Sequence, residues 1–102
     1  MALNPKEIDR LLVFAAAELA RKRRHRGLQL NHPEAIALLT DEVFEAARDG
    51  LPFDQVISRA RSTLRRRDVM EGVPEMIPTL HVDALFPDGT RLVTVHNPIW
   101  ED

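Results

Sequence analysis

The sequence predicts an α+β fold in one domain, residues 1–102, with three main α-helices, a short irregular or helical-turn segment and a C-terminal antiparallel β-hairpin. Three observations predict this fold. Apolar residues recur at helical spacing in the first part of the chain, and their period changes to two after Pro78. Between these parts, residues 69–78 (VMEGVPEMIP) follow no single period, and their glycine and prolines interrupt any helix or central strand.

The first helix is expected over about residues 5–26. Asn4 can cap its start, Pro5 suits the first helical position, and Glu7 can complete a capping box. Residues 11–17 (LLVFAAA) are apolar on every side of this helix. A helix without a polar face is a buried one, so this stretch has to be covered on more than one side.

The second helix is expected over about residues 32–49 and the third over about residues 53–65. Asn31 is expected to cap the second helix, and Gly50 to end it. The third helix has its apolar residues at i, i+3, i+4, i+7 and i+11, which are Phe53, Val56, Ile57, Ala60 and Leu64. After this helix, Asp68 is expected to cap a short helical turn.

The hairpin is expected over about residues 78–96, with a three-residue loop in the sequence FPDG. In that register the side chains of His81 and His96 point to opposite faces of the hairpin. A two-residue loop of Asp88 and Gly89 is the alternative, and it would place the two imidazoles directly opposite each other. Even then, two histidines fall short of a full set of metal ligands.

The composition is that of an ordinary globular chain, with 44% hydrophobic residues, 29% charged residues and a formal net charge of −2. The absence of cysteine excludes disulfides, thiolate ligands and a thiol nucleophile. The N-terminus lacks the basic and apolar regions of a signal peptide, and no apolar run approaches the roughly 20 residues that span a bilayer. We therefore expect a soluble, cytoplasmic chain.

No pattern typical of an independent enzyme is present. The serines, Ser58 and Ser62, lie in a helical pattern rather than in the strand–turn–helix context of a nucleophile elbow. Glu71 and Glu75 are separated by a glycine and a proline, so pairing with arginine or capping of a turn is favoured over a helical acid/base pair. We expect no catalytic, cofactor-binding or metal-binding residue in this chain.

Two features predict that the chain is one piece of a larger assembly. A two-stranded hairpin is only marginally stable alone and leaves two edges to be covered or extended. Two of the expected helices also have wider apolar arcs than so short a chain can bury.

Two basic clusters, Arg21–Arg26 and Arg65–Arg67, leave an alternative open. The chain could be a free-standing helical module that binds nucleic acid or an acidic partner through them. The first cluster also fits a solvated helix end before Gly27, where cations complement the helix dipole. Salt separates the two hypotheses, because phosphate-driven binding weakens steeply as salt rises and an apolar subunit interface does not.

Four stretches resemble the small (gamma) subunit of the bacterial nickel enzyme urease: LNHPEA at 30–35, ARDG at 47–50, VMEGVPEMIP at 69–78 and FPDGTRLVTVHNPI at 86–99. The resemblance implies a part of the enzyme that hydrolyses urea to ammonia and carbamate. It places the two nickel ions and the catalytic residues in the alpha subunit and none in this chain. The implied partners are the alpha and beta subunits in an (alpha-beta-gamma)3 assembly, with no nucleic acid and no membrane.

The resemblance also implies a structural role, with the matched stretches at the subunit interface. The residues expected there are Val69, Met70, Glu71, Gly72, Val73, Pro74, Glu75, Met76, Ile77, Pro78, His96, Asn97 and Pro98. Our hypothesis is that Val73, Met76 and Ile77 seat apolar side chains in the assembly. Gly72 and Pro74 would fix the backbone path that presents them.

Overall fold

The computed structural model describes residues 3–102. Its helices and strands, in chain order, are α1 (Pro5–His25), α2 (His32–Arg48), α3 (Phe53–Arg61), the 3₁₀ helix η1 (Arg66–Asp68), α4 (Val73–Met76), β1 (Thr79–Phe86) and β2 (Gly89–His96). The predicted α+β fold is confirmed, and the bounds of the first two helices differ from the expected ones by one residue at their C-terminal ends. Among the described residues, no helix has both the length and the apolar character needed to cross a membrane.

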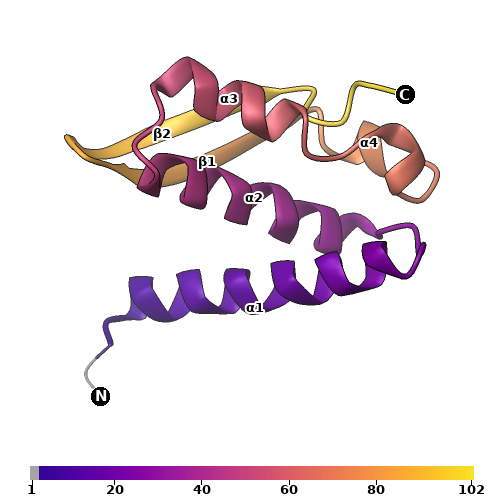
Figure 1. Ribbon diagram of the computed structural model, residues 1–102, viewed down its shortest axis with the longest axis horizontal. Coiled ribbons are helices and arrows are strands. Elements are labelled where there is room, and N and C mark those ends of the chain that lie inside the picture. The colour runs from indigo at the N-terminus through magenta and orange to yellow at the C-terminus, as the bar shows by residue number, and fades with distance from the viewer. Residues whose placement is uncertain (1–2) are drawn as a thin grey trace.

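Helix α2 is the centre of the molecule. It packs against α1 on one side and against α3 and β1 on the other. Figure 1 shows α1 at one edge of the molecule, with α2 beside it and α3 and the hairpin beyond α2. Because α1 lies at the edge, α2 is the one long helix that packs along it.

The starts of the two long helices confirm the predicted caps. The side chain of Asn4 accepts a hydrogen bond from the backbone of Glu7 at 2.8 Å, and the carboxylate of Glu7 accepts one from the backbone of Asn4 at 3.1 Å. Asn31 and Glu34 form the same reciprocal pair at 3.0 and 2.9 Å. These bonds satisfy backbone donors that the first helical turn leaves free.

Helix α3 ends earlier than expected, at Arg61. The hydroxyls of Ser62 and Thr63 both donate to the carbonyl oxygen of Arg59, at 3.1 and 2.7 Å. Hydroxyl side chains that bond nearby backbone groups compete with the helix for the same acceptors, which accounts for the early end. Leu64 is still fully buried, but it reaches the core from outside the helix.

The expected role of Asp68 as the cap of a following helical turn is wrong. Asp68 is the last residue of η1, and its carboxylate accepts a hydrogen bond from the backbone N–H of Arg65 at 2.8 Å. The turn that follows, α4, begins instead after Gly72, which has a left-handed φ of +89° and provides no side-chain cap. Asp68 therefore stabilises its own 3₁₀ turn and does not cap the helical turn that follows.

The hairpin register differs from both expected registers. The loop consists of Pro87 and Asp88, and Gly89 already pairs with Phe86. Gly89 has a φ of +125°, a conformation that glycine adopts without a steric penalty. The chain therefore reverses within two residues, and pairing resumes at Gly89 itself.

This register corrects the expected placement of the histidines. His81 lies opposite Thr94, and His96 lies opposite Thr79, so both imidazoles are on the same, exposed face of the hairpin. His81 Nδ1 is 3.2 Å from the hydroxyl oxygen of Thr94. Each histidine therefore faces a threonine rather than the other histidine.

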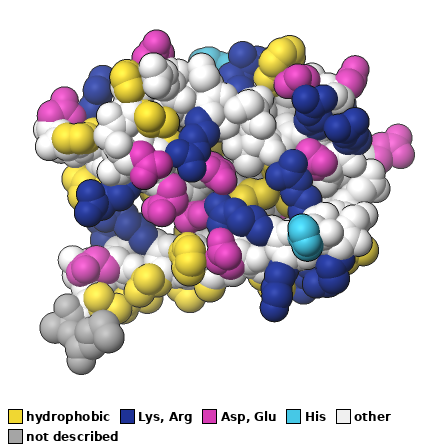
Figure 2. Space-filling model, in the orientation of Figure 1, with side chains coloured by type: hydrophobic (Ala, Val, Ile, Leu, Met, Phe, Trp, Pro, Cys, Tyr) yellow, Lys and Arg dark blue, Asp and Glu magenta, His cyan; other side chains and the backbone are white. Residues whose placement is uncertain are grey.

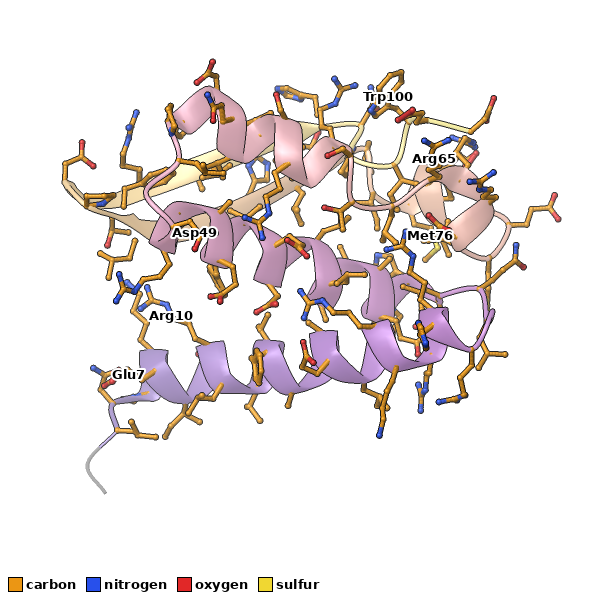
Figure 3. All side chains as sticks on the ribbon, viewed as in Figure 1. Glu7, Arg10, Asp49, Arg65, Met76 and Trp100 are labelled. Carbon is orange, nitrogen blue, oxygen red and sulfur yellow. The ribbon has the colours of Figure 1, made fainter. Side chains whose placement is uncertain are left out.

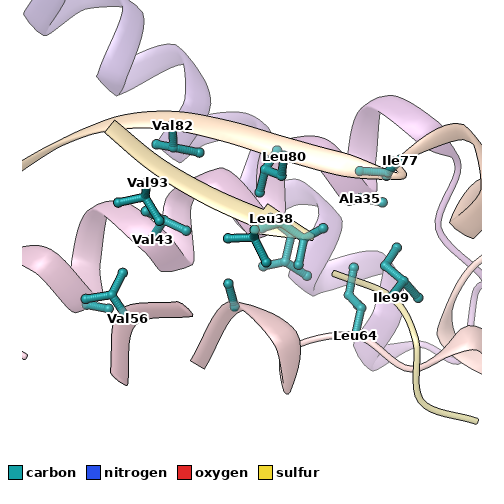
Figure 4. Packing of buried hydrophobic residues seen from close by; sticks show 14 of the residues in the cluster. Ala35, Leu38, Val43, Val56, Leu64, Ile77, Leu80, Val82, Val93 and Ile99 are labelled. Atoms are coloured by element: carbon teal, nitrogen blue, oxygen red, sulfur yellow. The ribbon is translucent and has the colours of Figure 1, made fainter. Parts of the chain in front are cut away.

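The core lies between α2, α3 and the inner face of the hairpin (Figure 4). Helix α1 contributes only Ala20 to it among the described residues. Its larger members are Leu30, Leu38, Leu39, Val43, Val56, Leu64, Val69, Val73, Ile77, Leu80, Val82, Phe86, Val93, Val95 and Ile99.

Candidate subunit interface

The outer face of α1 is apolar and exposed. Ala17 and Ala20 are the only α1 residues that are buried. On this face the exposed large apolar side chains are Ile8, Leu12 and Leu19, whereas the exposed Leu11 and Phe14 of the same helix lie beside α2; all five are between 45% and 63% exposed. Figure 2 shows hydrophobic side chains gathered along this edge of the molecule. Exposed apolar patches of this kind often mark interaction sites, so this face is a candidate contact surface.

Part of this face forms one continuous line. Ile8, Leu12, Ala15 and Leu19 follow each other at alternating steps of four and three residues. This is the spacing by which one helix packs its seam against another. The sequence already signalled this surface through its all-round apolar stretch, but the residues predicted for the interface did not include it.

Helix α1 is tied to the rest of the molecule by its C-terminal half. Arg21 donates hydrogen bonds to Asp41 at 2.7 Å and to Glu42 at 3.3 Å, both on α2. Burial alone would lower the pKa of Arg21, but its hydrogen bonds to Asp41 and Glu18 outweigh that effect and raise the pKa. In the N-terminal half, Arg10 and Val13 are the only residues that are even partly buried.

A cleft of about 550 Å³ opens between that N-terminal half and α2. Figure 3 shows Arg10 pointing from α1 towards α2 beside this opening, and its guanidinium lies 5.8 Å from the ring centre of Phe44. The cleft is lined by both apolar and charged residues. The apolar residues are Leu3, Leu11, Phe14, Phe44 and Leu85, and the charged ones are Glu7, Arg10, Asp41, Glu45 and Arg48.

The apolar residues of the predicted interface segment divide into two groups. Val69, Val73 and Ile77 are at most 4% exposed and belong to the chain's own core. Met70 and Met76 are 47% and 59% exposed. Burial of Val73 and Ile77 in the chain's own core argues against the hypothesis that they seat their side chains in a partner. Of the three residues in that hypothesis, Met76 alone is exposed.

The other residues of the predicted interface segment lie in or beside the single helical turn α4. Gly72 supplies the left-handed residue before α4, and Pro74 lies in its first turn. Arg66 donates a hydrogen bond to Glu75, and this bond lowers the pKa of the Glu75 carboxyl. This hydrogen bond agrees with the predicted pairing of the carboxylate with arginine. Glu71 and Pro78 are exposed.

The two stretches predicted for the interface meet in space. The backbone N–H of Asn97 donates to the carbonyl oxygen of Pro78 at 2.8 Å, which joins the end of the irregular segment to the end of β2. His96 and Asn97 are exposed, whereas Pro98 is buried.

Most arginines of the two basic clusters are paired within the chain. Figure 2 shows basic and acidic side chains interleaved across the face that it presents. The ion pairs of these clusters include Arg21–Asp41, Arg23–Glu34, Arg24–Asp68, Arg65–Glu101 and Arg66–Glu75. Such pairing reduces the positive charge available to a phosphate backbone.

The family model for the gamma subunit of urease matches residues 1–99 of this 102-residue chain. The chain belongs to the urease gamma-subunit family. It is therefore a subunit of urease, a hydrolase built from several subunits. The resemblance carried by the four sequence stretches is confirmed.

Membership of the urease family implies nickel in the catalytic subunit of the enzyme. Within residues 3–102 of this gamma chain, no group of three or more His, Cys, Asp or Glu side chains is placed to hold a metal ion. The described residues therefore do not fit a nickel centre.

Proposed function

We propose that this urease gamma chain is a non-catalytic, structural subunit of cytoplasmic, nickel-dependent urease. It packs against the catalytic alpha subunit and, with the beta subunit, supports an (alpha-beta-gamma)3 assembly. In this proposal the two nickel ions and the groups that hydrolyse urea to ammonia and carbamate belong to the alpha subunit.

The uncovered face of α1 carries the proposal. A free chain would leave Ile8, Leu12 and Leu19 between 45% and 63% exposed, so covering each of them recovers about half of the roughly 1.5–3 kcal/mol that full burial of such a side chain is worth. Packing in an assembly recovers this free energy without any change in the fold. We propose α1, Met70, Met76 and the joined ends at Pro78 and Asn97 as the contact surfaces.

The experiment is co-purification of the tagged chain from its native cells, followed by measurement of mass, nickel content and urease activity. A large complex with nickel and urease activity is the expected result. A small, nickel-free species that retains nucleic acid at low salt would overturn the proposal. In the expected complex, raising the salt concentration leaves the chain bound, because an apolar interface does not release counterions.

A further inference from the structure

The outer edge of β1 carries a row of unpaired backbone groups. Hydrogen-bonded and non-hydrogen-bonded pairs alternate along an antiparallel ladder. The hydrogen bond from the N–H of Asn97 to the carbonyl oxygen of Pro78 identifies which pairs of the ladder are the hydrogen-bonded ones, because Pro78 and Asn97 continue the same register. It follows that His81, Asp83 and Leu85 direct their N–H and C=O groups away from β2. Within residues 3–102, no backbone hydrogen bond outside the ladder engages these three residues.

This edge opens onto free space rather than onto a packed element. A second cleft, of about 220 Å³, is lined by His81, Val82 and Asp83 of β1 and by Lys6 and Asp9 of α1, among others. The larger cleft continues past Leu85 at the end of the same strand. Both clefts are lined by Arg10 and Phe44, so they adjoin across that contact. None of the residues that line them belongs to β2.

The free backbone groups of this edge determine which kind of segment can bind there. A helix satisfies its own backbone groups, so only an extended chain can pair with a row of free N–H and C=O groups. The larger cleft then offers apolar contacts to alternate side chains of such a chain through Leu11, Phe14 and Phe44. We propose that an extended segment of a partner subunit adds to β1 as the third strand of the sheet.

A second copy of this chain fits the edge less well than a partner strand. Pairing β1 with another β1 would bring two copies of α1 to the same edge, because α1 forms the opposite wall of the cleft in each copy. A single extended segment needs only the width of one strand, about 4.8 Å from β1.

This inference rests on the proposed role as an assembling subunit, and amide hydrogen exchange tests it without a variant. Exchange is compared, residue by residue, between the isolated chain and the assembled urease complex. We expect the amides of His81, Asp83 and Leu85 to exchange at least roughly tenfold more slowly in the complex. The outward amides of β2, at Leu92 and Thr94, should show no comparable slowing.

The two edges also provide a matched pair of variants. Asp83 and Leu92 face each other in the ladder, and the N–H group of each points outward, from β1 and β2 respectively. Proline at either position removes one outward donor and none of the bonds between the strands. We expect Asp83→Pro to lower the fraction of chain recovered in the complex about tenfold, and Leu92→Pro to leave it near the wild-type value.

The outcomes separate this inference from the proposed function. A complex that forms while the β1 amides exchange as in the isolated chain overturns the third strand and leaves the structural role intact. Slower exchange confined to the amides of β2 would likewise overturn the third strand and leave the structural role intact. If the wild-type chain joins no complex, the proposed function fails, and the third strand fails with it.

Discussion

Arg21 of α1 places its Nη2 atom 2.7 Å from Oδ2 of Asp41 on α2, and the side chain of Asp41 is only 5% exposed. The same guanidinium reaches Glu42, which also accepts a hydrogen bond from Arg59 of α3 at 3.0 Å. One chain of ion pairs thus links the three long helices. It compensates for the small apolar contact that α1 makes through Ala17 and Ala20.

Asp41→Ala should destabilise the chain by about 1–3 kcal/mol, because it removes the best-buried partner of Arg21. The free energy of unfolding in urea at neutral pH measures this loss. Asp49→Ala is the control, since Asp49 also pairs with an arginine at 3.0 Å but its side chain is 60% exposed. An exposed pair should cost less than about 1 kcal/mol. Equal losses in the two variants would contradict a special role for the pair between Arg21 and Asp41.

Stability should depend on pH through Glu34. The hydrogen bond from Arg23, followed by the one from the backbone of Asn31, lowers the pKa of the Glu34 carboxyl from its ordinary value of 4.5. A carboxyl with a lowered pKa stabilises the fold above its unfolded pKa, and this contribution is lost as the pH falls through the folded pKa. Glu34→Gln should therefore cost about 1 kcal/mol at pH 7 and progressively less below pH 4.5.

The measurement is the free energy of unfolding of both proteins from pH 7 to about pH 3. Glutamine can still complete the capping box, so the comparison isolates the charge. Glu7→Gln makes the same change in the capping box of α1 and serves as the control. A stability difference for Glu34→Gln that stays constant across the whole pH range would show that the carboxylate charge contributes nothing.

Sequence reasoning succeeded where the determinants are local. The helix starts at Asn4 and Asn31 depend on residues three positions apart, and both formed as predicted. It failed at the end of α3, where Ser62 and Thr63 hydroxyls compete with the backbone. It also failed for the loop register, which Gly89 shifts by pairing directly with Phe86.

The candidate interface shows the same division. That α1 needs more cover than one neighbour can give was visible in its all-round apolar stretch. Which residues of the irregular segment face outward was not visible, because Val73, Met76 and Ile77 are all apolar and no single period sorts them. Tertiary packing alone decides that Val73 and Ile77 enter the core while Met76 does not.

Leu12→Glu should abolish or strongly weaken incorporation into the urease complex and leave the chain folded. Leu12 is 63% exposed, so the free energy of unfolding of the isolated variant should lie within about 0.5 kcal/mol of the wild-type value. In the complex, the new carboxylate would be buried without a partner, which is costly. Sedimentation of the complex and urea unfolding of the free chain measure the two effects. Leu12→Met is the matched variant and should assemble normally.

Met76→Asp tests the second proposed contact surface by the same logic. The Met76 side chain is 59% exposed at the end of α4, whereas Val73 and Ile77 on either side of it are buried. An aspartate at position 76 should therefore leave the fold intact, and Val73→Asp should unfold it by placing a charge in the core. If Met76 lies against a partner subunit, Met76→Asp lowers the amount of assembled complex and its urease activity together, while Met76→Leu preserves both. Unchanged sedimentation and activity of the Met76→Asp complex would remove this segment from the interface and leave α1 as the proposed apolar contact.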